Sequence, residues 1–334
     1  MFEKKREKIN SELKKFLLEQ EFEIEESDDA FEKVIDFILR GGKRVRPMLF
    51  LEGYKLGGGK NFEECLRASL SLELLHNYLL VHDDIMDRDE LRRGGRTLHK
   101  MFEKSYDEWT SLSLAIVFGD FIRTLSLKSI LDSDFPSKRK QDAIEEIVKM
   151  EKSVIEGQAL DLTLQSVPIE NVDLQDVLKL YEMKTSSYTI SGPLKAGFSL
   201  SPKCNGNKEE FEEYGKKVGL AFQIKDDLLG IFGSEELTGK PTTSDIEERK
   251  KTVPLILALK LGTKKEKKKI KSYMEKPPDP ESVSIIRNLV ESTGAKAKSE
   301  NMASGLVGEG KRALKDFKSD FLTSLADLVV ERNY

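Results

Sequence analysis

Leucines recur at three- and four-residue steps through residues 63–87, at positions 66, 70, 74, 75 and 79. This spacing is the period of an α-helix that buries one stripe of side chains. Similar periods run through residues 31–40, 112–131, 141–165, 173–190, 208–229, 253–262 and 309–330. Alternating strand patterns are nearly absent. The hydrophobic pattern therefore predicts an all-α protein.

The domain organisation is less sharply defined by the sequence. The chain has 334 residues, with 10 prolines and 23 glycines, and no Pro-, Gly- or Ser-rich linker divides it. This length leaves open one large domain or two. The first 26 residues are charged and only weakly periodic, so we expect a loosely attached N-terminal helix there. The lysine run at 264–271 has one aromatic neighbour, Tyr273, and predicts a solvated helix face, not a nucleic-acid patch.

Composition restricts the partners and the compartment. The net charge of -4, with 34% charged residues, gives no general attraction for nucleic acid or an anionic membrane. The longest uncharged stretch, Trp109 to Gly119, is far shorter than the about 20 residues of a transmembrane helix. The N-terminus lacks the pattern of a secretory signal, and Cys65 and Cys204 do not form a disulfide framework or a zinc motif. We expect a soluble, cytoplasmic protein.

The segment 73–99 holds all three histidines and the first acidic cluster, DDIMD at 83–87. On a helix His76, Asp83 and Asp87 share one face, and Asp84 lies beside them. Like charges at this spacing cost about 0.2–0.5 kcal/mol per pair, and a hard cation would remove that cost. A solvated acidic helix end is the alternative interpretation of this cluster taken alone.

A second cluster, FQIKDD at 222–227, places Asp226 and Asp227 late in another predicted helix. Two aspartate pairs on separate helices could face each other across a cavity. Mg²⁺ commonly binds through one or two carboxylates together with substrate phosphates. The two clusters together therefore predict a Mg²⁺ site for a substrate that carries a diphosphate.

Two basic loops would supply the charge that such a substrate needs. One follows the first acidic cluster and contains Arg92, Arg93 and Arg96; the other is the motif GGKRVRP, with Lys43, Arg44 and Arg46. The planar fork of arginine suits phosphate oxygens, and glycine lets the backbone approach a ligand. An exposed loop remains the alternative interpretation of either run.

Six motifs in unbroken order carry a resemblance over residues of about 35–260. They are GGKRVRP (41–47), ELLHNYLLVHDDIMDRDELRRG (73–94), EGQALDL (156–162), MKTSSYT (183–189), FQIKDDLLGIFG (222–233) and GKPTTSDIEERKKTVPLI (239–256). With these motifs the chain resembles a trans-isoprenyl diphosphate synthase of the polyprenyl synthetase family, most like a short-chain geranylgeranyl diphosphate synthase. The resemblance implies a single helical domain over 1–334, a bundle around a central cavity, usually as a homodimer.

The resemblance also implies roles for individual residues. Mg²⁺, with more than one ion per site, would be held by Asp83, Asp87 and Asp226. The allylic diphosphate would be held by Arg92, Lys184, Thr185, Gln223, Lys240 and Lys250. Isopentenyl diphosphate would be held by Lys43, Arg46, His76 and Arg93. The implied catalytic residues are Asp83, Asp84, Asp87, Arg92, Arg93, Lys184, Asp226 and Asp227.

In two places the sequence departs from the family pattern. The second motif has Gly230 where many members have a third aspartate, which puts less weight on Asp227 than on Asp226. Arg249 stands where relatives often have glycine or asparagine, which makes the choice of Lys250 over Lys251 less secure. Neither departure removes the implied chemistry.

Chain length in this family is set by bulky residues just before the first acidic motif. These positions are Tyr78 and Leu79, and a single aromatic at the first of them is similar to twenty-carbon synthases. On an ideal helix Tyr78 points about 140° away from Asp83, so packing in the core is its alternative role. We expect geranylgeranyl diphosphate as the product, with a farnesyl or longer-chain synthase as the alternative.

Three other classes of function compete with this interpretation. A terpene cyclase would not need the motif GGKRVRP. An inactive regulatory subunit on the same fold would be expected to lose one aspartate motif, and both are present. A helical scaffold with an acidic face would leave the basic motifs unexplained.

Overall fold

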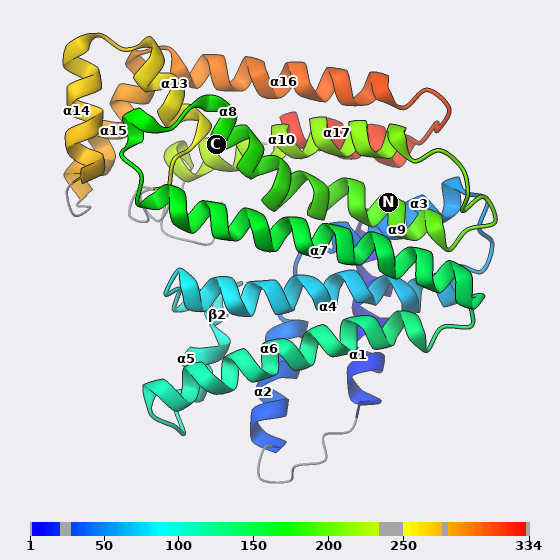
Figure 1. Ribbon diagram of the computed structural model, residues 1–334. Helices are drawn as coiled ribbons and strands as arrows, with labels where there is room; N and C mark the ends of the chain where they lie inside the picture. The colour runs from blue at the N-terminus through cyan, green and yellow to red at the C-terminus, as the bar shows by residue number, and fades with distance from the viewer. Residues whose placement is uncertain (1, 21–27, 234–249, 276–279, 332–334) are drawn as a thin grey trace. The chain divides into compact units, whose positions relative to one another are not determined.

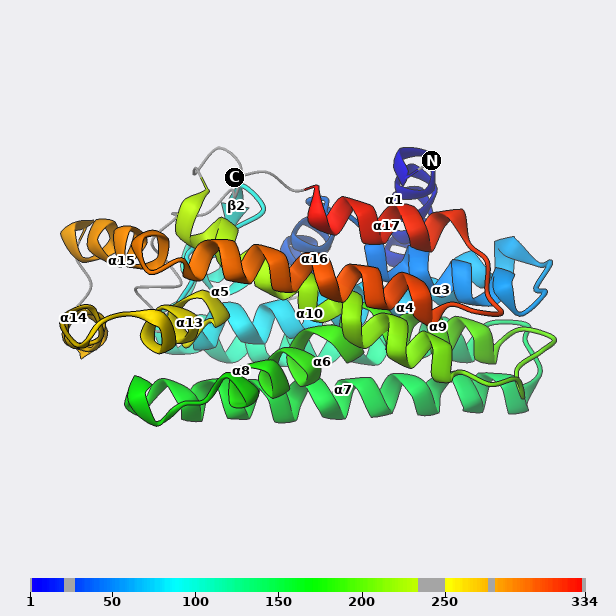
Figure 2. The same ribbon diagram turned by 90° about the horizontal axis from the view of Figure 1, so that it is seen from above.

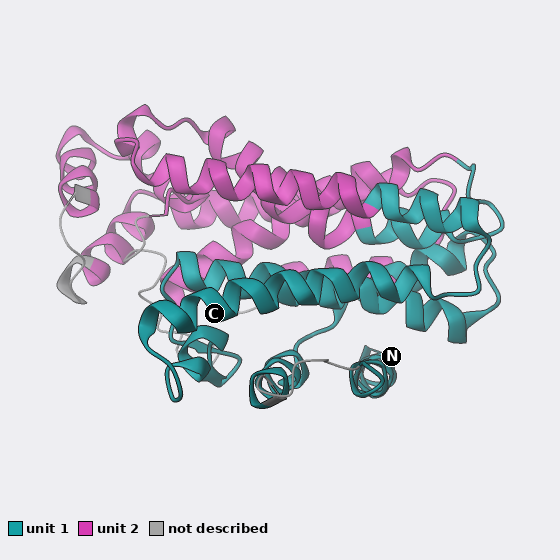
Figure 3. Cartoon of the chain, turned by 60° about the horizontal axis from the view of Figure 1, so that its bottom comes forward, with its two compact units in different colours: residues 1–146, 193–206 teal, residues 147–192, 207–334 magenta. Residues whose placement is uncertain are grey.

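The computed structural model describes residues 2–20, 28–233, 250–275 and 280–331 (Figure 1). Most of these residues are helical, which confirms the predicted all-α class. The strands among them are β1 (Leu91–Arg92) and β2 (Gly95–Arg96), which pair antiparallel in a short hairpin. The chain groups into two compact units, residues 1–146 with 193–206 and residues 147–192 with 207–334, shown in teal and magenta in Figure 3. The single domain over 1–334 stays a prediction.

Unit 1 is built on α4 (Phe62–Met86), the helix that ends in the first acidic motif. It packs against α1, α3 and α6, and its buried residues lie on all sides. The helices of this unit are α1 (Phe2–Leu18), α2 (Asp28–Leu39), α3 (Val45–Leu56), α4, α5 (Leu98–Phe102) and α6 (Glu108–Leu131). It also contains the start of α7 (Ser137–Gln165) and most of α9 (Gly192–Ser199). α4 thus has partners on several faces that fix its acidic end.

The N-terminal helix α1 is firmly packed, so the expectation of a loose attachment is wrong. Its residues Ile9, Leu13 and Phe16 are at most 1% exposed and form a stripe with helical spacing. Each such burial stabilises by about 1.5–3 kcal/mol. The charged residues between them hid this short stripe in the sequence. α1 therefore belongs to the core of unit 1.

Unit 2 is organised around α10 (Glu209–Phe232), which carries the second acidic motif. α16 runs along it, and α17 and the π-helix η3 also pack on it (Figure 2). Its further elements are η2 (Ile169–Asn171), α8 (Leu174–Tyr181), η3 (Glu182–Ser191), α13 (Val253–Leu261), α14 (Lys264–Glu275), α15 (Pro280–Ser292), α16 (Ala295–Ala313) and α17 (Asp320–Val330). The residues 147–165 of α7 belong here as well.

Most predicted helical ranges coincide with helices, but two are not one continuous α-helix. The range 309–330 crosses a break, because α16 ends at Ala313 and α17 begins at Asp320. The range 173–190 changes from α- to π-helix after Tyr181. α3 was not predicted, since it is buried on nearly all sides and shows no apolar stripe. The lysine run lies on α14 with most of its lysines exposed, which confirms the predicted solvated face.

Within the described residues, no helix combines the length and the apolar character that crossing a bilayer requires.

Candidate active site

The first acidic motif lies at the C-terminal end of α4. Asp87 caps the helix, and its N–H donates to the carbonyl of Asp83 at 2.8 Å. Arg88 then turns the chain with a left-handed φ of 58°. Asp83 and Asp87, one turn apart, are half-buried, whereas Asp84 is fully buried. The motif therefore presents two carboxylates at the surface of unit 1 and keeps the third inside.

The buried Asp84 is hydrogen-bonded to the loop that contains Arg92, Arg93 and Arg96, called the arginine loop below. Arg92 Nε donates to Asp84 Oδ1 at 2.6 Å, and Arg92 Nη2 reaches Asp89 Oδ2 at 2.7 Å. Asp84 Oδ2 is buried and has no hydrogen-bond partner in the described part of the chain. Burial raises the pKa of Asp84 to about 6, although Arg92 acts in the opposite direction. The end of α4 thus holds negative charge that its surroundings do not fully neutralise.

This charge distribution fits a divalent cation. Mg²⁺ prefers oxygen ligands and takes one or two carboxylates, completing its shell with phosphate oxygens and water. Asp83 and Asp87 supply two such carboxylates from unit 1, and Asp226 belongs to unit 2. No group of three or more acidic, histidine or cysteine side chains is arranged around a metal position in the residues that the structure describes. The two half-buried carboxylates of Asp83 and Asp87 match the one or two that Mg²⁺ takes beside substrate phosphates.

The arginine loop is a tight hairpin. Arg93 and Gly94, with φ of 53° and 74°, occupy the two turn positions between β1 and β2. A two-residue hairpin turn of this kind requires positive φ at both positions, for which asparagine or glycine is usual. In the described chain, the non-glycine residues with positive φ are Arg44, Arg88 and Arg93. Such backbone strain persists only where the surroundings impose it, and it is concentrated at functional sites.

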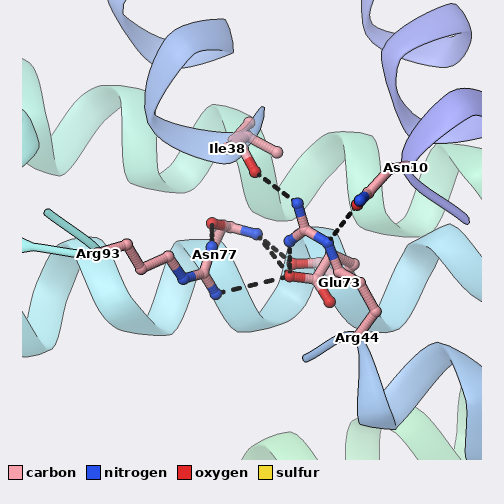
Figure 4. Close-up of polar contacts among 6 residues, drawn as sticks. All are labelled: Asn10, Ile38, Arg44, Glu73, Asn77 and Arg93. Carbon is pink, nitrogen blue, oxygen red and sulfur yellow. Dashed lines mark hydrogen bonds and ion pairs between the residues drawn. The ribbon is translucent and has the colours of Figure 1, made fainter. Parts of the chain in front are cut away.

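Glu73 on α4 holds two of these strained arginines (Figure 4). Its carboxylate accepts a hydrogen bond from Arg44 Nη1 and lies 3.7 Å from Arg93 Nη2. Arg93 Nη1 also donates to Asn77 Oδ1 at 3.3 Å, and Asn77 Nδ2 donates to Glu73 Oε1 at 3.3 Å. The side chains of Glu73 and Arg44 are 2% and 0% exposed. This buried carboxylate therefore fixes the position of Arg93.

Arg44, which was counted among the cations of the motif GGKRVRP but not assigned to a substrate, has a structural role. Its Nε donates to Asn10 Oδ1 of α1 at 2.8 Å, and its Nη2 donates to the Ile38 carbonyl at 3.1 Å. With Glu73 on the third side, the guanidinium is enclosed by the protein. Its neighbours Lys43, which is exposed, and Arg46, which is half-buried, are the two residues of this motif that the resemblance assigned to isopentenyl diphosphate.

His76, Arg46 and Arg93, three of the four residues assigned to isopentenyl diphosphate, come together in unit 1. Burial, and then the charges of Arg46 and Arg93, hold the pKa of His76 well below its usual value, with Arg44 and Arg92 adding to the effect. The imidazole is therefore neutral at pH 7. Burial and the neighbouring arginines also lower the pKa of Arg93, although Glu73 raises it. Excess positive charge of this kind favours a bound anion.

A cleft in unit 2 gathers four of the six residues assigned to the allylic diphosphate. Lys184, Thr185, Gln223 and Lys250 line it, together with other polar residues such as Asp161. Of the remaining two, Arg92 belongs to unit 1, and Lys240 lies outside the described residues. The structure thus brings together residues that are far apart in the sequence and that share one predicted ligand.

The polar groups of this cleft are hydrogen-bonded in two sets. Lys184 Nζ lies 2.8 Å from Asp161 Oδ2. Thr185 Oγ1 donates to Gln223 Oε1 at 2.8 Å, and Gln223 Nε2 donates to Asp227 Oδ1 at 3.1 Å. Asp161 was not assigned a role from the sequence, although it lies within the motif EGQALDL. The need of Lys184 for an acidic partner is the signal that could have pointed to Asp161.

The structure also distinguishes two pairs of adjacent residues, Lys250 from Lys251 and Asp226 from Asp227. Both lysines line the cleft, but Lys251 is buried and donates to the Gln165 carbonyl at 2.7 Å, whereas Lys250 is half-buried. This difference supports Lys250 as the ligand. Asp227 is 3% exposed and Asp226 is half-buried, which agrees with the greater weight given to Asp226.

The π-helix η3 places Lys184 and Thr185 in the cleft. A Cβ on Gly219 of α10 would lie 2.5 Å from Ser186 Cα, and one on Gly157 of α7 would lie 2.9 Å from Lys184 N. Glycine is therefore required at both contacts, since no side chain fits between these backbones. π-helical segments are rare and occur frequently at functional sites. The hydrophobic period over 173–190 predicted a helix here but not its π form.

The chain-length residues lie on α4. The ring of Tyr78 packs edge-on against His82, with centroids 4.8 Å apart, and Leu79 is half-buried. His82 in turn lies close to α6, because a Cβ on Gly119 would lie 2.9 Å from His82 Nε2. Tyr78 thus packs against His82, which contacts α6. Its role in limiting chain length stays a prediction.

Known proteins are similar to this chain over the region that contains the acidic motifs and the basic loops. The polyprenyl synthetase family matches residues 28–292. The short chain isoprenyl diphosphate synthase of Methanocaldococcus jannaschii is 31% identical over 264 residues, which are 79% of this chain and 74% of that protein. The geranylfarnesyl diphosphate synthase of Aeropyrum pernix is 30% identical over 312 residues, which are 89% and 92% of the two chains.

A solved structure is similar over the whole chain. The geranylgeranyl pyrophosphate synthase of Corynebacterium glutamicum, complexed with isoprenyl diphosphate and magnesium, has a TM-score of 0.91 at 32% identity and covers 100% of both chains. The family match spans both acidic motifs and both basic loops. On this evidence, the chain belongs to the polyprenyl synthetase family.

Proposed function

We propose that the protein is a prenyltransferase that condenses isopentenyl diphosphate head to tail with an allylic diphosphate. The allylic substrate is dimethylallyl, geranyl or farnesyl diphosphate, and the product is geranylgeranyl diphosphate. The observation that carries the proposal is the cleft of unit 2, where Lys184, Thr185, Gln223 and Lys250 meet. Two lysines beside two neutral hydrogen-bonding side chains suit a diphosphate, which needs both charge and directed donors.

Mg²⁺ is the proposed cofactor, with Asp83, Asp87 and Asp226 as ligands and more than one ion per site. When bound, the metal neutralises charge on the leaving diphosphate. Asp83 and Asp87 present their carboxylates at the end of α4, where Asp84 adds buried negative charge. The chemistry of these donors supports Mg²⁺ over a softer metal.

The chain's own residues would act mainly by holding charge in place. Lys184 and Lys250 would stabilise the diphosphate as the C–O bond of the allylic substrate breaks, and such positioned charge is commonly the largest catalytic effect. His76, Arg46 and Arg93 would hold isopentenyl diphosphate, with the neutral imidazole accepting or donating a hydrogen bond. The double bond of that substrate attacks the allylic carbon, a new C–C bond forms, and one proton is lost. The released diphosphate can accept that proton, so no protein base is required.

The proposed homodimer is supported by apolar side chains at the surface of two helices. On α6, Trp109 is 77% exposed and Val117 is 61% exposed. On α7, Val148, Ile155 and Leu162 are exposed at seven-residue steps, the spacing of a helix–helix seam. Exposed apolar stripes of this kind are typical of subunit interfaces. The cytoplasmic location stays a prediction.

Diphosphate release tests the proposed function. With Mg²⁺ present, release should require both substrates, and release from the allylic substrate alone would indicate a terpene cyclase. Lys184→Ala should raise the KM for the allylic substrate by about tenfold or more, because a charged hydrogen bond to a phosphate contributes about 1.5–3 kcal/mol. Lys179→Ala, on the exposed side of the neighbouring α8, is the matched control and should leave the KM unchanged. No release with either substrate would favour an inactive subunit.

A further inference from the structure

Tyr181, the last residue of α8, connects two segments of the cleft through its hydroxyl. The hydroxyl donates a hydrogen bond to Asp227 Oδ2 and accepts one from the backbone N–H of Val253 at 3.1 Å. All three residues are buried, with 5%, 3% and 0% exposure. One oxygen atom thus satisfies a buried carboxylate and the first backbone N–H of α13.

The two groups that Tyr181 joins belong to segments with predicted ligands. Asp227 also accepts from Gln223, which lines the cleft. Val253 is the first residue of α13 and follows Lys250 by three positions. Without the phenol, the start of α13 would lose this hydrogen bond to α8. The placement of Lys250 beside Gln223 therefore depends on a residue that need not touch the substrate.

We propose that Tyr181 is a positioning residue for the allylic diphosphate: its hydroxyl fixes the start of α13, and hence Lys250, against the second acidic motif. The proposal rests on the proposed function and deepens it. It assigns the hydroxyl to one substrate, because its hydrogen-bond partners lie in unit 2 with the cleft. The isopentenyl diphosphate residues belong to unit 1.

Tyr181→Phe is the direct test, because it removes one oxygen and keeps the ring. The KM for farnesyl diphosphate should rise roughly tenfold, the loss expected for one hydrogen bond to a charged group. The KM for isopentenyl diphosphate should change less than about twofold. Binding of inorganic diphosphate with Mg²⁺, measured by calorimetry, should weaken to the same extent as the allylic KM.

Tyr214→Phe is the matched control. Its hydroxyl is also buried and donates to the Leu322 carbonyl at 2.7 Å, at the contact of α10 with α17. This variant should lose comparable stability but leave both KM values and diphosphate binding unchanged. Equal effects of the two variants on the allylic KM would overturn the proposal, since a general loss of stability would then explain both.

Amide hydrogen exchange gives a readout that does not depend on activity. In Tyr181→Phe the peptide covering residues 251–257 should exchange faster, because Val253 N–H has lost its acceptor, and in Tyr214→Phe it should not. If the wild type forms no condensation product, the proposed function is wrong. Amide hydrogen exchange and the binding of inorganic diphosphate still test the role of Tyr181 in that case. Unchanged exchange in this peptide would overturn the proposal.

A second variant removes the other end of the hydrogen bond. Proline at position 253 lacks the N–H, and the first helical position tolerates it. Thr252, with φ of -96° and ψ of 157°, has the extended conformation that precedes proline without strain. Val253→Pro should therefore raise the allylic KM, and combining it with Tyr181→Phe should add little. Independent, additive effects on KM would contradict a shared hydrogen bond.

Discussion

The buried carboxylate of Glu73 should stabilise unit 1 more than any surface ion pair. Glu73→Gln keeps the size of the side chain but removes its negative charge, which leaves Arg44 and Arg93 beside a neutral amide. The Arg44 side chain is 0% exposed and cannot turn to water. Removing one partner of a buried pair destabilises a protein by about 3–5 kcal/mol, because the remaining charge stays buried.

Glu52→Gln on α3 is the matched control for this variant. The Glu52 side chain is 1% exposed, but its partners Lys5 and Lys55 are 29% and 59% exposed. Both lysines can turn to solvent when the charge is lost, so we expect a loss of about 1 kcal/mol or less.

Urea unfolding at pH 7 measures both variants, with the midpoint and slope compared to the wild type. Glu73→Gln should lower the free energy of unfolding by about 3 kcal/mol or more. The KM for isopentenyl diphosphate should also rise, since Arg93 loses its fixed position. A loss below about 1 kcal/mol for Glu73→Gln, or equal losses for the two variants, would refute the reasoning from burial.

Two further perturbations address the C-terminal part of α4. Tyr78→Ala should lengthen the product beyond twenty carbons, while Tyr78→Phe, which keeps the ring against His82, should not. Product length is measured by chromatography of the dephosphorylated products. Equal product lengths for the two variants would show that Tyr78 does not limit chain length. Asp84 has a pKa of about 6 against an ordinary 3.8, so the folded state binds the extra proton and its stability falls as pH rises from about 4 to about 6. In EDTA, the free energy of unfolding of Asp84→Asn should therefore rise relative to that of the wild type by up to about 3 kcal/mol across that range. If the difference measured by urea unfolding stays constant with pH, the raised pKa of Asp84 is contradicted.

The residues assigned to the allylic diphosphate came from a resemblance that rests on short sequence motifs. Lys184, Thr185, Gln223 and Lys250 come from three separate motifs, and the structure places all four around one cleft. The helix that carries each acidic cluster was also predicted, since a long amphipathic period is a strong signal. The motifs thus identified residues that share a cleft, and their ligand roles stay a prediction.

What the sequence did not predict depends on tertiary packing. Arg44 and Arg46 look alike in GGKRVRP, and only the fold shows that Arg44 is enclosed by Asn10 and Glu73. The π-helix at η3 depends on a backbone contact with Gly219, which no periodicity reports. Tyr181 resembles any apolar residue at the end of a helix until its hydroxyl is placed. In each case the deciding contact is with a residue far away in the sequence, and the sequence does not show which residue that is.

The most direct test of the central claim is the product formed from isopentenyl and farnesyl diphosphates by the purified protein with Mg²⁺. We predict geranylgeranyl diphosphate, with one diphosphate released per condensation and no product after EDTA treatment. Absence of any condensation product, or release of diphosphate from farnesyl diphosphate alone, would contradict the assignment of this site to chain elongation.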